Sequence, residues 1–138
     1  MKILSFFFLL ISLFFISCNK NQETQTKVIK LLETTKSWNG ATLPKYLEGT
    51  PQVTILKIII PPKTKLKMHK HPVMNAAVVL KGELMVITTK QDTLRIKEGN
   101  AFEEVVNTWH YGLNNSNKPV EILVFYAGVK ESPITILK

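Results

Sequence analysis

Short blocks of apolar and β-branched residues, separated by polar turns, fill the chain from residue 50 onward. The first block, residues 53–60, is stopped by Pro61-Pro62 and predicts a strand that is buried on at least one face. Further strands are expected at residues 66–71, 73–80, 83–89, 93–97, 101–106, 110–113, 120–126 and 134–137. Turn residues such as Lys81-Gly82 lie between the blocks, and no block keeps a helical period. The pattern therefore predicts an all-β sandwich or barrel.

The alternation within two of these blocks predicts how each strand is covered. Polar and apolar residues alternate over residues 93–97, so Leu94 and Ile96 are expected to point inward. Residues 120–126 are apolar at nearly every position, which is typical of a strand covered on both faces by a second sheet.

The first eighteen residues are typical of a targeting signal. Lys2 supplies a positive start, and residues 3–16 are apolar except for two serines. This run is shorter than the roughly 20 residues that a spanning helix needs. Its end, Phe15-Ile16-Ser17-Cys18, resembles a bacterial lipoprotein cleavage box, which implies a signal peptide of residues 1–18 and lipidation of Cys18. An ordinary secretory signal and an uncleaved anchor are the alternatives, and all three place the domain outside the cytoplasm.

Cys18 is the only cysteine of the chain, so an acylated Cys18 leaves no thiol for a disulfide, a thiolate metal site or nucleophilic catalysis. The next residue is Asn19 rather than the aspartate that resembles an inner-membrane retention signal, which favours a periplasm-facing lipoprotein of the outer membrane. A membrane contact through the lipid anchor follows from this interpretation.

Residues 19–49 are expected to form a flexible tether and an irregular lead-in to one domain of residues 50–138. Within the lead-in, the apolar residues 28–32 fit either a helical turn or a short strand. Ser37-Trp38-Asn39-Gly40 predicts a turn.

The formal net charge of +8 does not indicate nucleic-acid binding. Aromatic residues are not interleaved with the lysines as a stacking platform requires, and an exported protein rarely meets nucleic acid. Four lysines lie around the first two histidines: Lys63, Lys65, Lys67 and Lys70. They indicate a solvated face or, alternatively, a positive rim for anionic substrates or an anionic membrane surface.

All three histidines of the chain fall in two short blocks of β-like sequence. His69 and His71 are one residue apart on an extended backbone, so both imidazoles project to the same side. His110 lies in the second block, residues 99–114. If the two blocks meet in a barrel, three imidazoles can bind zinc, copper, iron or nickel and leave a position open for water or substrate. A structural histidine cluster without a metal is the alternative.

The spacing of these two blocks resembles the two motifs of the cupin superfamily. His69, His71, Asn75 and Gly82 stand at the His, His, Glu and Gly places of the first motif. Gly99, Val105, Asn107, His110 and Asn114 stand at the Gly, Pro, Gly, His and Asn places of the second. The resemblance covers roughly residues 50–128. It implies a double-stranded β-helix, or jelly-roll, cupin barrel with the histidines pointing into its interior.

Asn75 is the main departure from the cupin pattern, because metal-binding cupins commonly have a glutamate ligand at this place. Asparagine offers only a neutral carbonyl, so Asn75 is a weak fourth ligand, and hard metals such as manganese are expected to bind less well. The three histidines also resemble those of cupin-type thiol dioxygenases, which hold iron without a carboxylate. Glu103 and Glu104 lie on opposite faces of the strand entering His110, so one of them points into the barrel. It can replace the missing carboxylate or act as a general base, and we favour Glu104.

Two classes of function are expected from these residues. The first is a metal-dependent enzyme, a dioxygenase or other oxygenase or an isomerase, that acts on a small polar molecule. The second is a non-catalytic module of the cell envelope that binds a metal or a small ligand, and a purely structural barrel is a third reading. Trp109 and Tyr111 are expected to face away from His110 and to pack, and Asn114 to organise a turn. Cupins often pair through their barrel sheets, so the apolar strand 53–60 is either core or the contact of a homodimer.

Overall fold

The computed structural model describes residues 25–138. The lipoprotein-type signal, Cys18 and the first part of the expected tether lie outside the described residues. Within residues 25–138, the chain forms ten β-strands and no helix. This part of the chain accordingly contains no helix that is long and apolar enough to cross a membrane.

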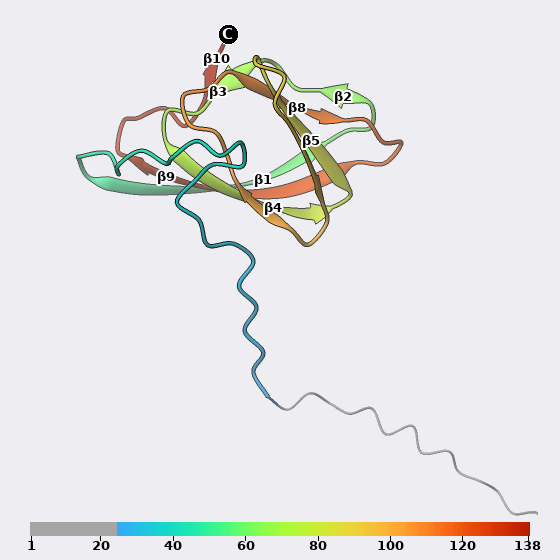
Figure 1. Cartoon of the computed structure of the whole chain (residues 1–138), viewed down its shortest axis with the longest axis horizontal. Coiled ribbons are helices and arrows are strands. Elements are labelled where there is room, and N and C mark those ends of the chain that lie inside the picture. Colours follow the sequence, from blue (N-terminus) through green and yellow to red (C-terminus); the bar gives the residue numbers. More distant parts are fainter. Residues whose placement is uncertain (1–24) are drawn as a thin grey trace, which may run out of the picture.

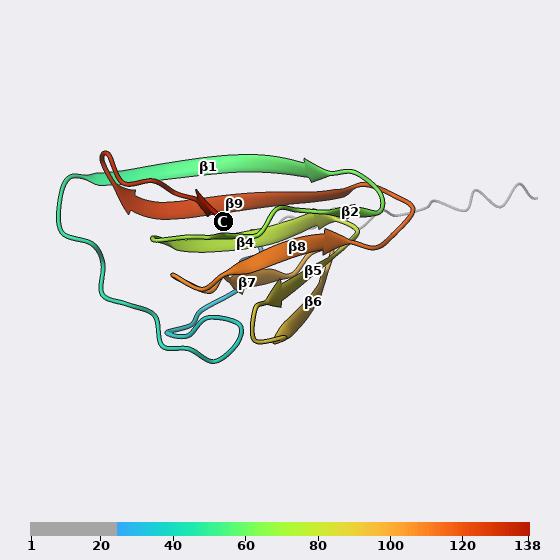
Figure 2. The same cartoon turned by 90° about the horizontal axis from the view of Figure 1, so that it is seen from above.

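The strands form two antiparallel sheets that curve around a common interior (Figure 1). They are β1 (Pro51–Ile60), β2 (Thr64–Lys65), β3 (His69–Lys70), β4 (Met74–Lys81), β5 (Glu83–Thr88), β6 (Thr93–Lys97), β7 (Ala101–Glu103), β8 (His110–Asn114), β9 (Val120–Val129) and β10 (Ile136–Leu137). One sheet has the order β1-β9-β4-β7, and its long strands run side by side in Figure 2. The other has the order β10-β3-β8-β5-β6, with β2 also paired to β8. The predicted all-β jelly-roll barrel is confirmed.

Three residues at motif positions fix turns of the chain. Gly82, between β4 and β5, has a φ of 82°, and a Cβ there would lie 3.2 Å from Cγ2 of Val120. Both the backbone conformation and this close contact disfavour a side chain at this position. Asn107 has a φ of 53°, which asparagine tolerates better than most residues. Asn114 is buried, and its Nδ2 donates to the carbonyl oxygens of residues 60, 61 and 118. The predicted turn role of Asn114 is confirmed.

The core fills the space between the two sheets. It consists of Ile60, Val73, Ala77, Val79, Leu84, Val86, Ile96, Phe102, Val120, Ile122, Val124 and Tyr126. Ile96 is buried and Leu94 packs against the same cluster, as the alternation of β6 predicted.

Two predictions about strand coverage need correction. The second sheet packs on one face of β9 only, so Val124 is buried whereas its neighbour Phe125 is 38% exposed. The prediction that residues 120–126 are covered on both faces is therefore wrong. The inward face of β1 is only partly covered: Ile60 is fully buried and Ile58 packs against the core, whereas Leu56, which lines the cavity, is 36% exposed.

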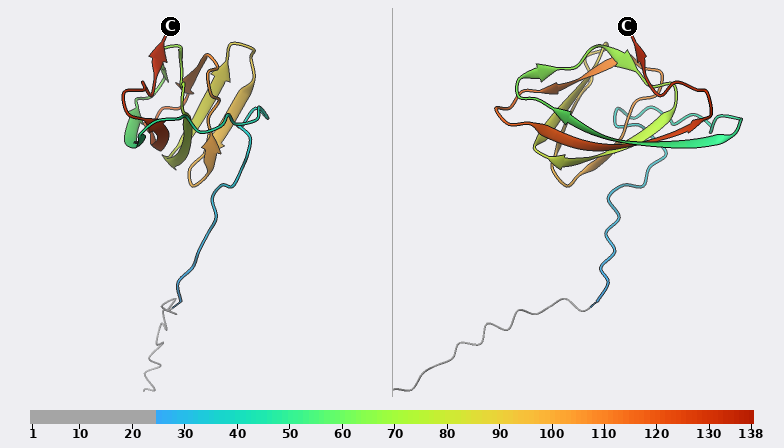
Figure 3. Two further views of the ribbon diagram at one scale, coloured as in Figure 1. Left: turned by 90° about the vertical axis from the view of Figure 1, so that its left-hand side faces the viewer. Right: turned by 180° about the vertical axis from the view of Figure 1, so that it is seen from behind.

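The lead-in closes against the barrel as an irregular segment. Residues 28–32 form neither a helix nor a strand, and their apolar side chains are exposed. The predicted turn at residues 37–40 is confirmed, and a bridge between Lys36 and Thr42 closes it. The backbone N–H of Trp38 donates to the carbonyl oxygen of Glu103 over 3.0 Å. In Figure 3 the preceding segment, drawn in blue, leads away from the barrel.

Candidate metal centre

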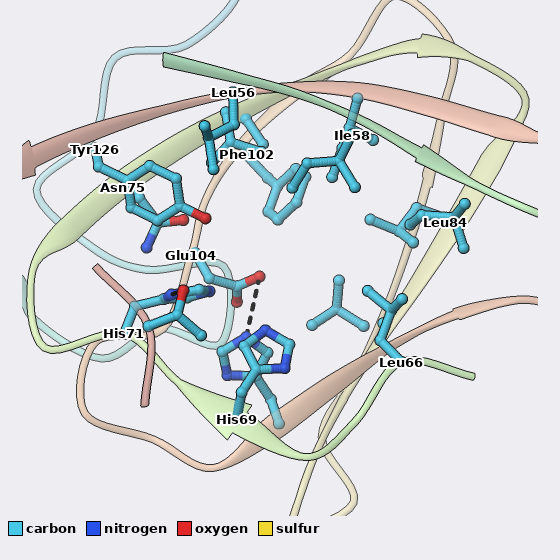
Figure 4. A pocket seen from close by; sticks show the side chains of 18 of the residues that line it. Leu56, Ile58, Leu66, His69, His71, Asn75, Leu84, Phe102, Glu104 and Tyr126 are labelled. Atoms are coloured by element: carbon cyan, nitrogen blue, oxygen red, sulfur yellow. Dashed lines mark hydrogen bonds and ion pairs between the residues drawn. The ribbon is translucent and has the colours of Figure 1, made fainter. Parts of the chain in front are cut away.

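The three histidines converge at one end of the barrel interior (Figure 4). His69 on β3 and His110 at the start of β8 are direct partners in the antiparallel ladder. His71 follows β3 and bridges to Val106 in the β7–β8 connection. One ring nitrogen from each histidine lies within 4.8 Å of the others. The ring centroids are 4.5 to 5.1 Å apart. The fold therefore brings both sequence blocks into one site.

Backbone carbonyls fix the orientation of all three rings. Nδ1 of His69 lies 2.7 Å from the carbonyl oxygen of Lys67, Nδ1 of His71 lies 2.8 Å from that of Ile134, and Nδ1 of His110 lies 2.8 Å from that of Thr108. A carbonyl oxygen only accepts, so each neutral ring carries its proton on Nδ1 and its lone pair on Nε2. A histidine that binds a metal through one ring nitrogen usually donates such a hydrogen bond from the other.

Burial keeps the three imidazoles in the neutral form that a metal requires. It lowers the pKa of His71 to about 4, and it is also the main cause that lowers the pKa of His69 and of His110. The neighbouring imidazoles act in the same direction on His69 and His71, because a second positive charge nearby is unfavourable. At neutral pH the site therefore presents three unprotonated Nε2 atoms.

Glu104 contributes a buried carboxyl to the same site. Its Oε2 lies 3.7 Å from Nε2 of His110, and its Oε1 accepts from Nε1 of Trp38 at 2.7 Å and from the backbone N–H of Val105 at 2.9 Å. Burial raises the pKa of Glu104, against the hydrogen bonds that lower it. One carboxylate oxygen is thus held by donors, and the other faces the imidazoles.

Glu103 points to the opposite side of the sheet. It is half-buried and lines a separate depression on the outer surface with Met74 and Phe125. The two glutamates differ because β7 ends at Glu103 and the backbone N–H of Glu104 still donates to the carbonyl oxygen of Asn75 at 2.9 Å, which keeps the alternation of faces. Of the two tentative general bases, Glu104 is the one inside the cavity.

Asn75 lines the cavity on β4, where it pairs with Tyr126 of β9. It is buried, and its Nδ2 makes a long contact of 3.5 Å with the carbonyl oxygen of Val73. Its side chain can offer only a neutral oxygen, so Glu104 is the residue of this site that can supply negative charge.

Trp38 belongs to the site although its local sequence predicts only a turn. The residue lies 66 positions before Glu104. Its neighbour Ser37 adds a hydrogen bond from Oγ to the backbone carbonyl oxygen of Glu104 at 2.9 Å. A single tryptophan in a largely polar lead-in is the one signal that pointed to a buried contact.

Two further residues on the C-terminal side reach His71. The Tyr126 ring lies 5.4 Å from the His71 ring, and Oγ1 of Thr135 lies 3.2 Å from Nδ1 of His71. Thr135 and the carbonyl of Ile134 hold His71 from the segment before β10, and Tyr126 contacts it from β9. The site is therefore complete only when the end of the chain is in place.

The aromatic residues beside His110 lie outside the cavity, as predicted from the strand period. Nζ of Lys65 lies 4.0 Å from the Tyr111 ring centroid, and Nζ of Lys70 lies 5.1 Å from that of Trp109. These lysines therefore stack on aromatic rings outside the cavity, one on β8 and one just before it. Of the four lysines around the first histidines, Lys67 alone lines the cavity.

The cavity has a volume of about 260 Å³ and two chemically different ends (Figure 4). The histidines, Glu104, Asn75, Tyr126 and Thr135 form a polar end. Apart from Lys67 and Gly112, the remaining lining is hydrocarbon from both sheets: Leu56, Ile58, Ile60, Leu66, Ala77, Leu84, Val86, Phe102, Ile122, Val124 and Leu137.

The donor set at the polar end fits a divalent transition metal. Three neutral imidazoles suit zinc, copper, iron and nickel, and the carboxyl of Glu104 can supply negative charge. The fold and this group of histidines define a small cupin barrel with a candidate metal centre.

The chain belongs to the family described as "Cupin domain", which matches residues 56–126 and so includes all three histidines. No curated protein matches the chain.

Several solved structures share the fold. Oxalate oxidase in complex with the substrate analogue glycolate is 19% identical with a TM-score of 0.53, over 62% of this chain and 45% of that chain. The DMSP lyase DddQ from Ruegeria pomeroyi DSS-3 is 19% identical with a TM-score of 0.54, over 62% and 43%. A cupin domain from Bordetella pertussis Tohama I is 17% identical with a TM-score of 0.50, over 62% and 99%. The chain thus spans less than half the length of the oxidase and the lyase, and the likeness concerns the fold.

Proposed function

We propose that this protein binds one divalent transition metal through His69, His71 and His110 and uses it in the chemistry of a small molecule. The observation that carries the proposal is the arrangement of the three rings. Each Nδ1 is held by a backbone carbonyl, which leaves Nε2 to bind a metal, and one ring nitrogen from each histidine lies within 4.8 Å of the others beside a buried carboxyl. A metal bound there would supply a Lewis acid or an oxygen activator, as expected of an oxygenase or an isomerase.

Glu104 has two possible tasks in this proposal. With Oε1 held by Trp38 and Val105, its free Oε2 faces His110 and can serve as the carboxylate ligand that Asn75 does not provide. The same oxygen can take a proton from a substrate bound in the cavity, because its raised pKa brings it closer to neutral pH. If Glu104 is a ligand, the site binds hard metals such as manganese better than three histidines and an amide would alone.

A non-catalytic metal- or ligand-binding module is the second candidate. The observation that favours it is the lining of the cavity, most of which is apolar. The presence of Glu104 beside the histidines, in contrast, favours a metal-dependent enzyme.

The oxalate oxidase structure holds glycolate, so small carboxylates belong in the first set of compounds to test.

Oxygen uptake and product formation distinguish these two candidates. The protein reconstituted with iron, copper, nickel, zinc or manganese is mixed with small carboxylates and thiols, and the Glu104→Gln variant is measured in parallel with Glu103→Gln. Turnover that is lost in Glu104→Gln and kept in Glu103→Gln supports the enzyme. Saturable binding without turnover for any metal supports the module.

We also propose that the protein is exported and anchored to the outer membrane through a lipidated Cys18. Residues 2–18 support this with a positive start, an apolar run and a single cysteine at its end. Metabolic labelling with a radioactive fatty acid should label the wild-type protein and leave Cys18→Ser unlabelled. Label on both proteins, or on neither, would contradict the anchor.

A homodimer through the outer face of β1 and β9 completes the proposal. Ile55 and Phe125 are neighbours in the ladder, and both are exposed, as are Val53 at 69% and Ile59 at 59%. An apolar face of this kind favours association. Sedimentation should give a dimer for the wild type and a monomer for Ile55→Glu, and a wild-type monomer at all concentrations would contradict it.

A further inference from the structure

The hydrocarbon end of the cavity has no role in holding a metal. It is formed from both sheets, by Ile58 on β1, Phe102 on β7 and Leu84 on β5, and by Leu66 between β2 and β3. Figure 4 shows these side chains across the cavity from the histidines. Any molecule that fills the whole cavity must satisfy both ends.

The backbone of β8 makes room for this end. Gly112 on β8 lies beside Leu66 and Leu84, which flank it in the same sheet, and a Cβ there would lie 3.0 Å from Cδ1 of Leu66 and 3.5 Å from Cδ1 of Leu84. The backbone N–H of Leu66 donates to the carbonyl oxygen of Gly112 at 2.9 Å. The absence of a side chain at Gly112 therefore lets two leucines approach the strand that begins with His110.

A wholly polar substrate is poorly matched to such a lining. Polar groups placed against Leu66, Leu84 and Phe102 would lose their hydrogen bonds to water and find no partner there. The small polar molecule expected from the sequence would fill the polar end only. An apolar group placed against the same residues gains free energy in proportion to the surface removed from water.

We propose that the site takes a small amphipathic molecule, with a metal-binding head at the histidines and a compact aliphatic or aromatic group in the hydrocarbon end. The inference rests on the proposed function for the head and on the lining for the tail. The volume of about 260 Å³ lies below the roughly 300–1,000 Å³ of pockets for drug-sized ligands, so the whole molecule is short.

A homologous series of linear alkyl hydroxamates from two to ten carbons tests the two ends separately. The series is titrated by calorimetry into the full chain, metal-loaded and metal-free, after the metal content has been measured. We expect the affinity to rise about fourfold for each added methylene over the first members, as about 0.8 kcal/mol per buried CH₂ requires, and to stop rising when the tail fills the end. The rise in affinity per methylene measures how the tail contacts the hydrocarbon end. The difference in affinity between metal-loaded and metal-free protein measures how the head contacts the metal.

Variants on β5 locate the tail. Leu84→Phe narrows the hydrocarbon end and should weaken the longest hydroxamates at least tenfold with the metal content unchanged. Met85→Phe, its neighbour on the opposite face, is the matched control and should leave the series unchanged. Leu66→Phe, at a half-buried position, is the second variant if Leu84→Phe fails to fold.

The outcomes separate this inference from the proposed function. An affinity independent of chain length in both loaded and metal-free protein overturns the amphipathic ligand, even if metal binds. A rising slope without any metal content supports the hydrocarbon end and removes the metal-dependent function. A slope that Leu84→Phe and Leu66→Phe leave unchanged means that the tail binds elsewhere, which also overturns the inference.

Discussion

The two ends of the cavity are built by different kinds of contact. At the polar end, backbone carbonyls of Lys67, Thr108 and Ile134 hold one ring each, so three distant segments must be in place together. At the hydrocarbon end, side chains pack without directional bonds. The polar end is therefore sensitive to single atoms, whereas the hydrocarbon end responds to volume. Changes at the polar end are therefore expected to affect metal binding more than changes at the hydrocarbon end.

The largest effect is expected from the metal itself. A metal that binds the folded protein only should stabilise it by about 4 kcal/mol when its free concentration is 1,000 times the dissociation constant. Thermal and urea unfolding of the metal-free and metal-loaded protein measure this difference. His110→Ala, in which one ring of the polar end is missing, should lose most of the gain. An equal gain in wild type and variant would mean that the metal binds elsewhere.

The histidines should make the metal-free protein acid-labile. The pKa of His71 is about 4 in the folded state against 6.5 for the free side chain, so the unfolded chain binds the proton first. Stability is full above about pH 6.5 and is lost as the pH falls toward 4, by on the order of 3 kcal/mol for this residue. Urea unfolding between pH 4 and 7 measures the slope, and His71→Gln should flatten it.

Glu104 contributes to this pH dependence with the opposite sign. Its raised pKa means that the unfolded chain ionises first, so its contribution to stability falls as the pH rises above 4.5. Glu104→Gln keeps an oxygen for Trp38 and Val105 but carries no charge. It should therefore stabilise the metal-free protein at pH 7 and, by removing the charge, weaken metal binding about 10- to 100-fold. Burial also raises the pKa of Glu103, so Glu103→Gln is the control for metal binding only and should leave the metal affinity unchanged.

Trp38→Phe is expected to have a smaller effect at the same end. It removes the hydrogen bond from Nε1 to Glu104 while most of the ring remains, so metal affinity should fall about tenfold and stability by about 1 kcal/mol. Trp109→Phe, just before β8 and outside the cavity, is the matched control. If both variants bind metal equally well, Trp38 does not position Glu104.

The smallest effect on metal binding is expected at the hydrocarbon end. Val124→Ala on β9 enlarges the cavity and removes two methyl groups from the core, which should cost about 1–3 kcal/mol of stability and leave metal affinity unchanged. A metal titration alongside urea unfolding measures both. A large loss of metal affinity would show that the two ends are coupled.

The sequence predicted the strands well because each is bounded by strong turn residues, such as Pro61-Pro62 and Gly82. The prediction that the His69 and His71 side chains point to the same side followed from the two-residue period of a strand. The period also required one of Glu103 and Glu104 to point inward. These were all local inferences, and each depended on residues a few positions apart.

The errors and omissions concern contacts between distant segments. Nothing near Phe125 indicates that the outer face of β9 lacks a covering sheet. Residues 28–32 are apolar without a packing surface, so neither alternative for them formed. Trp38 reaches Glu104 across 66 positions, and the hydrocarbon end needs both sheets to exist. Such features depend on how distant strands are arranged in the fold, and the residue pattern of one segment does not reveal this arrangement.

The metal content of the protein purified without a histidine tag, measured by elemental analysis beside His71→Ala, tests the central claim most directly. Both proteins are first shown to be folded by circular dichroism. We predict close to one equivalent of iron, copper, nickel, zinc or manganese in the wild type and less than a tenth of that in the variant. No metal in the wild type after reconstitution with each ion, or equal metal in both proteins, would contradict the account.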